Sequence, residues 1–249
     1  MRMTLLVPAA LLLLVLPRPV LAQGSEDPQT YVSKADFFSI DFPGQPKVED
    51  VQYPDEYRIT LPARVYTAVQ GKNTYRVTVV DYTKAPALHA ARNKACIHDA
   101  GADKPGLTQQ QRKDLTGDAC QDETVKDIRG AMMYAAWNII NKADKVTHLA
   151  YYNSDLIEGY EVHANNPDGT RTYGVAHMYE NRLYIIEAIA PQKAPAANWF
   201  QISIRFLNEK YEPVRYTYSG LMIYSNGYPK PPLAGQNGQA AAAAAQGGR

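Results

Sequence analysis

The sequence predicts an α+β fold: an antiparallel β-sheet meander covered by two or three helices, within a single domain of residues 23–233. Segments of strand composition recur between strong turn signals, and the apolar period changes to helical spacing in two places. The 249 residues are 45% hydrophobic and 10% aromatic, so the chain can bury a substantial core.

The two ends of the chain are expected to lie outside this domain. Residues 1–22 have the order of a secretory signal peptide: Arg2, then the short apolar run 5–16, then a small-residue cleavage site before Gln23. A membrane-spanning helix needs about 20 apolar residues, so we expect no integral membrane segment after cleavage. The segment 234–249, rich in Ala, Gly and Gln, is predicted to be a disordered tail. Export predicts a periplasmic or secreted location.

The charge balance argues against nucleic acid as a partner. Removing Arg2 and Arg18 from the 26 basic residues leaves 24 against 25 acidic ones. A protein with no basic excess has no field to attract nucleic acid or anionic lipid.

The two cysteines, Cys96 and Cys120, predict one structural disulfide. An even, minimal count in an exported protein favours a disulfide, and Cys-x-x-Cys spacing is absent. A catalytic thiol or a metal site is the alternative interpretation.

Strand signals dominate both halves of the chain. Residues 37–42 form an opening strand, and 57–70 with 74–82 form a hairpin in which Pro62 indicates a bend or an edge position. The sequence Asn-Pro-Asp-Gly at 166–169 is a strong turn signal. Four more strands are predicted at Val146–Asn153, Ile157–Asn165, Thr170–Tyr179 and Leu183–Ala190.

Helical spacing is found between the two groups of strands and after them. The apolar side of the first predicted helix is Leu88, Ala91 and Ala95, and that of the second is Met133, Ala136, Trp137 and Ile140. Residues 199–209 fit either a strand or a helix, and a helix is favoured. The stretch 101–126 is polar and is expected to be tied to the first helix by the disulfide.

The segment Phe38-Ser39-Ile40-Asp41-Phe42-Pro43-Gly44-Gln45-Pro46, followed by a hairpin, resembles the opening of exported bacterial proteins of the PsbP and Mog1 group. The segment 181–188, with a helix after it, is similar to the later strands of that group. This resemblance implies an α/β/α sandwich without shared catalytic residues, used mostly for binding or assembly.

No catalytic constellation emerges from the motifs. His163 and His177 lie on neighbouring predicted strands, but the turn at 166–169 separates them by about five strand positions, or over about 15 Å. The pair His98-Asp99 is interpreted as a helix C-terminal cap. The sequence therefore predicts no catalytic residue, no metal and no cofactor.

Tyrosine is the unusual feature of the composition, with 18 residues. A tyrosine-rich face suits binding of a protein, peptide or glycan, although tyrosine is also a good strand residue. Glu187 interrupts a buried strand and is expected to pair with Arg171 or Arg182, or else to have a raised pKa. Glu161 is expected on a solvated face. The predicted binding residues are Tyr173, Tyr179, Tyr184 and Glu187.

The predicted function is thus a non-enzymatic exported binding or assembly module that acts through a tyrosine-rich face. The alternative is a periplasmic hydrolase that uses Glu187 with His163 or His177. That alternative requires the carboxylate and an imidazole to meet in one pocket.

Overall fold

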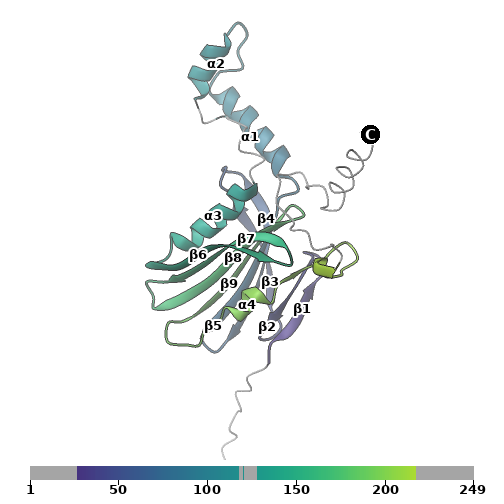
Figure 1. Ribbon diagram of the computed structural model, residues 1–249. Helices are drawn as coiled ribbons and strands as arrows, with labels where there is room; N and C mark the ends of the chain where they lie inside the picture. Colours follow the sequence, from purple (N-terminus) through teal and green to yellow (C-terminus); the bar gives the residue numbers. More distant parts are fainter. Residues whose placement is uncertain (1–26, 118–119, 121–127, 217–249) are drawn as a thin grey trace, which may run out of the picture.

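The structure, a computed structural model, describes residues 27–117, 120 and 128–216 (Figure 1). The predicted signal peptide and C-terminal tail therefore lie outside the described residues. The strands are β1 (Gln29–Ser33), β2 (Phe38–Phe42), β3 (Lys47–Pro54), β4 (Thr60–Gln70), β5 (Asn73–Asp81), β6 (Lys145–Ser154), β7 (Ile157–Asn165), β8 (Thr170–Tyr179), β9 (Arg182–Pro191) and β10 (Arg205–Phe206). The helices are α1 (Ala85–Asp99), α2 (Gln109–Thr116), α3 (Ile128–Ile140), α4 (Trp199–Ile202) and the 3₁₀ turn η2 (Val214–Tyr216).

All strand pairs are antiparallel, as predicted. A seven-stranded sheet has the order β3-β4-β5-β9-β8-β7-β6, and a three-stranded sheet has the order β1-β2-β10. The chain runs β6-β7-β8-β9 as a meander, and β9 then pairs with β5. This long-range pairing joins the two hairpin systems, and it leaves β3 and β6 as the two edge strands.

The turns explain why the meander forms at these residues. The turn 166–169 closes with Gly169 at φ +77°, a conformation that glycine adopts without strain. The two-residue turn Glu180-Asn181 has φ of +50° and +59°, which is the geometry of a tight hairpin between β8 and β9.

The two faces of the large sheet have different covers. Helix α3 lies across β7 and β8 on one face, and the three-stranded sheet with α4 covers the other (Figure 1). The larger core lies between the sheets and includes Phe38, Phe42, Phe200 and Phe206. The α+β class is confirmed. The predicted cover of two or three helices is not confirmed, because a second sheet packs with α4 on one face of the large sheet. The resemblance to the PsbP and Mog1 group stays a prediction.

Helix α3 buries a different side from the predicted one. Ala131, Met132, Ala135, Ala136 and Ile139 are buried, whereas Met133 and Trp137 are 41% and 54% exposed. The small alanines allow α3 to approach the sheet closely, and Ile139 lies directly over Gly174, where a Cβ atom would be 2.5 Å from its Cδ1. The predicted apolar side is therefore shifted by about one residue, and it leaves two large side chains in solvent.

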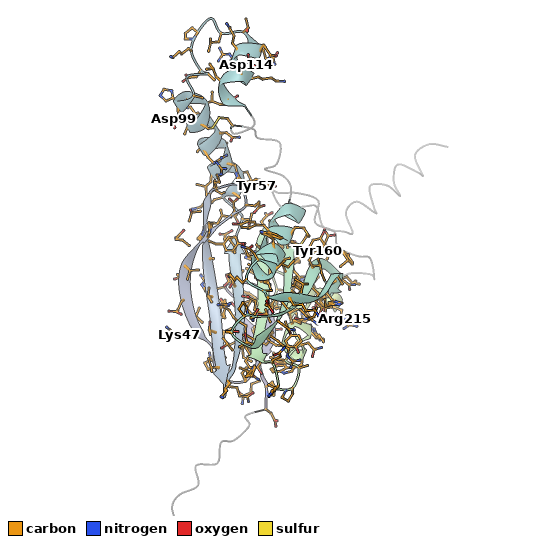
Figure 2. All side chains as sticks on the ribbon, turned by 90° about the vertical axis from the view of Figure 1, so that its left-hand side faces the viewer. Lys47, Tyr57, Asp99, Asp114, Tyr160 and Arg215 are labelled. Atoms are coloured by element: carbon orange, nitrogen blue, oxygen red, sulfur yellow. A yellow bond between two sulfur atoms is a disulfide. The ribbon has the colours of Figure 1, made fainter. Side chains whose placement is uncertain are left out.

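Helices α1 and α2 project away from the sheets as an arm (Figure 2). The predicted disulfide Cys96–Cys120 is confirmed, and it ties α1 to the polar stretch as expected. The sequence reasoning missed α2, although its capping box is readable: Thr108 Oγ accepts from the Gln111 amide, and Gln111 Oε1 accepts from the Thr108 amide.

The predicted apolar side of α1 is wrong. Its buried residues are Ala85, His89 and Asn93, while Leu88 is 38% exposed. At the root of the arm, His89 Nε2 lies 3.0 Å from Asp55 Oδ2, and both side chains are almost fully buried. Because α1 leaves the body after its first turns, only its N-terminal part meets the core, through Ala85 and the polar side chains of His89 and Asn93.

The segment 199–209 is helical only at its start. Helix α4 ends at Ile202, and β10 then pairs with β2 through Arg205–Ser39 and Phe206–Phe38. The segment is thus helical first and extended afterwards, so the helical pattern and the strand pattern in its sequence each describe one part of it. Within the described residues, no helix is both long and apolar enough to cross a membrane.

Candidate functional site

The three predicted binding tyrosines are part of the core. Tyr184 is fully buried, and Tyr173 and Tyr179 are 7% and 5% exposed. The hydroxyl of Tyr184 donates to the backbone carbonyl of Asp36 at 2.8 Å, which fastens the β1–β2 turn to the large sheet. Burial raises the pKa of the Tyr184 phenol far above its usual value. These rings fill the space between the two sheets and present no joint surface to solvent.

Glu187 lies on the α3-covered face of the large sheet, opposite Arg76 on the neighbouring strand. Its Oε2 is 2.9 Å from Arg76 Nη2 and 3.0 Å from Nε. The carboxylate is therefore paired as expected, but with Arg76 instead of Arg171 or Arg182. Its cross-strand neighbour on β8 is Gly174, which lies under α3.

The histidines considered for catalysis lie on the other face. His163 pairs across strands with Tyr173, and His177 pairs with Tyr184, both members of the core between the sheets. Successive strand residues point to opposite faces, so the sheet separates Glu187 from both imidazoles. The structure thus does not bring together the groups that a Glu–His hydrolase would need.

Glu161 is not on a solvated face. Its carboxylate lies 3.0 Å from His163 Nε2 and 3.3 Å from His148 Nε2, and it also accepts from the side-chain amide of Gln201. Helix α4 brings the fully buried Gln201 over this part of β7, which the sequence pattern could not show. Burial lowers the pKa of His163, while Glu161 opposes that shift. In the described part of the chain, no three His, Cys, Asp or Glu side chains are placed to hold a metal ion.

His177 is completely buried, and its surroundings keep it neutral. Its Nδ1 donates to the Glu158 carbonyl at 3.0 Å, and its Nε2 is buried without a hydrogen-bond partner. Burial lowers the pKa of His177 to about 4, because an imidazolium here would lack compensation.

This burial predicts a pH-dependent stability. Between pH 6.5 and 4 the unfolded chain takes up a proton at His177 and the folded chain does not, so stability falls as the pH falls. From this group alone we expect a loss of about 2 kcal/mol between pH 7.5 and pH 5. A His177→Asn variant keeps an N–H donor for Glu158 but does not titrate. Urea unfolding at both pH values should show a pH effect smaller by about that amount, and equal effects in the two proteins would contradict the assignment.

An open pocket of about 490 Å³ lies beside the β1–β2 turn. In its wall, Arg64 Nη1 is 2.9 Å from Asp36 Oδ2, and Arg64 Nε is 3.2 Å from Asp50 Oδ1. The Tyr66 hydroxyl also donates to Asp36, and burial raises the pKa of Tyr66 to about 12. These groups engage one another and hold the turn on the sheet, so their arrangement is explained by the fold.

A different surface is formed on the α3-covered face of the large sheet, by exposed side chains of α3 and of the edge strand β6. Met133 and Trp137 on α3 are 41% and 54% exposed, and Leu149 and Tyr151 on β6 are 51% and 52% exposed. We call these four residues the α3–β6 face. Large apolar and aromatic side chains exposed to solvent on one face of a protein are typical of a contact surface.

The geometry places all four side chains on the same side of the molecule. Leu149 pairs across strands with Val162, which packs with Ile139 of α3, so Leu149 and Tyr151 are on the α3-covered face. Met133 and Trp137 lie on the outward side of α3, opposite its buried residues, and α3 itself lies on this face of the sheet. Ile140 of α3 and Tyr160 of β7, the strand next to β6, both pack against the cluster of Ala136, Ile139 and Val162.

Strand β6 also offers backbone hydrogen-bonding groups. Within residues 27–117, 120 and 128–216 its outer edge has no paired strand. Its only Lys, Arg, Asp or Glu is Lys145, and a register shift between Val146 and His148 marks a bulge near that end. The other edge strand, β3, carries Lys47, Glu49 and Asp50 and ends at Pro54, which are features that discourage pairing. Residues 148–154 of β6 carry none of them.

Comparison with known proteins gives no assignment. No protein-family model matches the chain, and no curated protein matches it.

Proposed function

We propose that this chain is a non-enzymatic binding and assembly module, exported to the periplasm or secreted, and that it contacts a protein partner through the α3–β6 face. The observation that supports it most is the exposed Trp137 on the same face of the large sheet as the edge strand β6, whose residues 148–154 carry no Lys, Arg, Asp or Glu. Trp and Tyr are enriched among the residues that dominate the energetics of protein interfaces. An edge strand adds backbone hydrogen bonds to a partner in extended conformation.

Two further observations favour binding over catalysis. The acidic and imidazole groups considered for hydrolysis lie on opposite faces of the sheet, as described above. The disulfide Cys96–Cys120 fits an oxidising compartment. The proposed contact surface differs from the tyrosine set expected from the sequence, because those rings are needed in the core.

Selection from a displayed library of extended peptides tests this function. We expect enriched peptides to alternate apolar and polar residues, because such a strand can add to β6 and cover Leu149 and Tyr151. A Trp137→Glu variant should lose at least about ten-fold in affinity for the selected peptides, which corresponds to about 1.4 kcal/mol.

The matched control is Leu115→Glu, which places the same charge at a 49% exposed residue on the distant helix α2. Its affinity should equal that of the unmodified chain. The proposal fails if no peptide is enriched, or if the two variants bind equally well.

A further inference from the structure

We infer that the open pocket beside the β1–β2 turn binds a free α-amino acid, with the carboxylate of the ligand on Arg182 and its ammonium group on Asp81. The pocket belongs to the face of the large sheet that carries the three-stranded sheet, since its wall includes Val79 of the core between the sheets. The inference therefore concerns a second site, on the face opposite the α3–β6 face, and it does not depend on the proposed function.

The pocket has the size of a small-molecule site. Its volume of about 490 Å³ falls within the range of about 300–1,000 Å³ that is typical of ligand pockets. It lies between the β1–β2 turn, which contributes Ala35 and Asp36, and strands β3, β4, β5 and β9. Three aspartates and two arginines line it, so charged groups decide which ligand it accepts.

At the β9 end of the pocket, two opposite charges do not neutralise each other. Asp81 and Arg182 are direct cross-strand partners on β5 and β9, a placement in which opposite charges normally pair. Within the part of the chain that the structure describes, however, neither of them forms an ion pair. Asp81 Oδ1 accepts from the Thr83 amide at 2.8 Å, which leaves the carboxylate with further acceptor capacity. On the β3 side, by contrast, the ion pairs of Arg64 already join the opposite charges.

The guanidinium of Arg182 is held in place without the use of most of its donors. It lies over the ring of Phe37, 4.7 Å from the ring centroid, and its Nη1 donates to the Glu180 carbonyl at 3.3 Å. Phe37 is itself stacked on Tyr211, with ring centroids 5.7 Å apart and an interplanar angle of 20°. Because the ring covers one face of the guanidinium, a ligand binds at the guanidinium edge, where two parallel N–H groups match a carboxylate.

The backbone at this stack is strained. Phe37 and Tyr211 have φ of +55° and +64°, a left-handed conformation that is uncommon for aromatic residues. Such conformations persist only where the surrounding structure enforces them, and they are frequent at ligand-binding sites. Here the strained Phe37 presents its ring to Arg182, so the fold positions the arginine before any ligand binds.

The two charges together select a zwitterion. An anion alone on Arg182 would lie beside Asp81, in a lining that already has one aspartate more than it has arginines. A cation alone on Asp81 would leave the Arg182 guanidinium beside it without a counter-ion. A free α-amino acid carries an ammonium group and a carboxylate on the same carbon atom, so it satisfies both groups at once. The uncharged part of the wall, which includes Val51, Pro62 and Val79, is then left for its side chain.

Isothermal titration calorimetry of the purified chain with the standard L-α-amino acids tests the inference. We expect at least one of them to bind with a Kd below about 1 mM. Two derivatives of that amino acid isolate its charges: the amide lacks the carboxylate, and the N-acetyl derivative lacks the ammonium group. Each derivative should bind at least about ten-fold more weakly than the free amino acid, because it leaves Arg182 or Asp81 without a partner.

Two variants connect each charge of the ligand to its residue. Arg182→Gln should bind the free amino acid at least about ten-fold more weakly and should no longer distinguish it from its amide. Asp81→Asn keeps an oxygen for the Thr83 amide, and it should no longer distinguish the free amino acid from its N-acetyl derivative. The matched controls, Arg112→Gln and Asp114→Asn, change the same residue types on the distant helix α2 and should leave every affinity unaltered (Figure 2).

The derivatives are compared on the unmodified chain, so that part of the test does not depend on the folding of a variant. If Arg182→Gln is unstable, Arg182→Lys keeps the positive charge and should bind the amino acid more weakly while still preferring it to the amide. Three results would each overturn the inference: no standard amino acid binds with a Kd below about 1 mM, the derivatives bind as tightly as the free amino acid, or both variants keep the preferences of the unmodified chain. All three leave the proposed function standing, because the peptide selection probes the opposite face of the sheet.

Discussion

Replacing Asp55 by alanine should destabilise the protein by about 3–5 kcal/mol, because the side chain satisfies three partners in a site closed to water. Its Oδ1 accepts from the amides of Tyr57 and Ile59 at 2.9 and 2.8 Å, and its Oδ2 lies 3.0 Å from His89 Nε2. The Asp55 side chain has no exposed surface, and burial raises the pKa of its carboxyl despite these partners. Urea unfolding at constant pH measures the change.

Two variants separate the contributions to this effect. Asp55→Asn keeps an oxygen for the two amides and removes only the negative charge, so it should cost clearly less than Asp55→Ala. Glu187→Gln alters an ion pair whose Arg76 side chain is 35% exposed, and it should cost at most about 1 kcal/mol. A loss below about 1 kcal/mol for Asp55→Ala would show that the root of the α1–α2 arm does not depend on this carboxylate.

The Asp55–His89 contact also shows why the buried side of α1 could not be predicted from the sequence. The period of apolar residues in α1 pointed to Leu88, Ala91 and Ala95, yet the protein buries His89. A helix that touches the body only by its first turns has no continuous apolar face to reveal. In α3, apolar residues occur on nearly all sides of the helix. Their spacing therefore predicted a helix here but could not predict which side is buried.

Strands were easier to predict than their order in the sheet. Turn chemistry at 166–169 and at Glu180-Asn181 delimited β7, β8 and β9 almost to the residue. Strand β3 was missed because its sequence, with Lys47, Glu49 and Asp50, is that of an exposed edge and lacks apolar alternation. The pairing of β5 with β9 joins residues over 100 positions apart and cannot be inferred from local pattern.

The candidate interface could not be predicted from the sequence, because it depends on the strand order and on the buried side of α3. Leu149 and Trp137 are both visible in the sequence as apolar residues, but their exposure follows from the edge position of β6 and from the rotation of α3. The buried tyrosines illustrate the converse. Tyrosine is a residue type that is common at binding surfaces, yet the ring and the hydroxyl of Tyr184 both join the two sheets.

Gly159→Ala is the second substitution from which we expect a large effect, a loss of at least about 3 kcal/mol. A Cβ atom on residue 159 would lie 2.5 Å from His177 Nδ1 and 2.6 Å from the backbone oxygen of Ala176. The oxygen belongs to β8, which pairs with β7 at this point, so it cannot move without disturbing the ladder. Overpacking of this kind commonly costs 1–3 kcal/mol and more where backbone must shift.

Gly174→Ala is the matched control, one strand away. Its Cβ would also meet an atom at 2.5 Å, but that atom is the terminal Cδ1 of Ile139, and the next neighbour is 3.6 Å away. Since the isoleucine side chain can rotate, we expect a cost of about 1 kcal/mol or less. A His177→Asn background should recover part of the Gly159→Ala loss, because the ring contact disappears while the contact with the Ala176 oxygen remains. Equal stabilities of the two glycine variants would mean that His177 does not lie against β7, and the neutral, buried state assigned to this histidine would lose its structural basis.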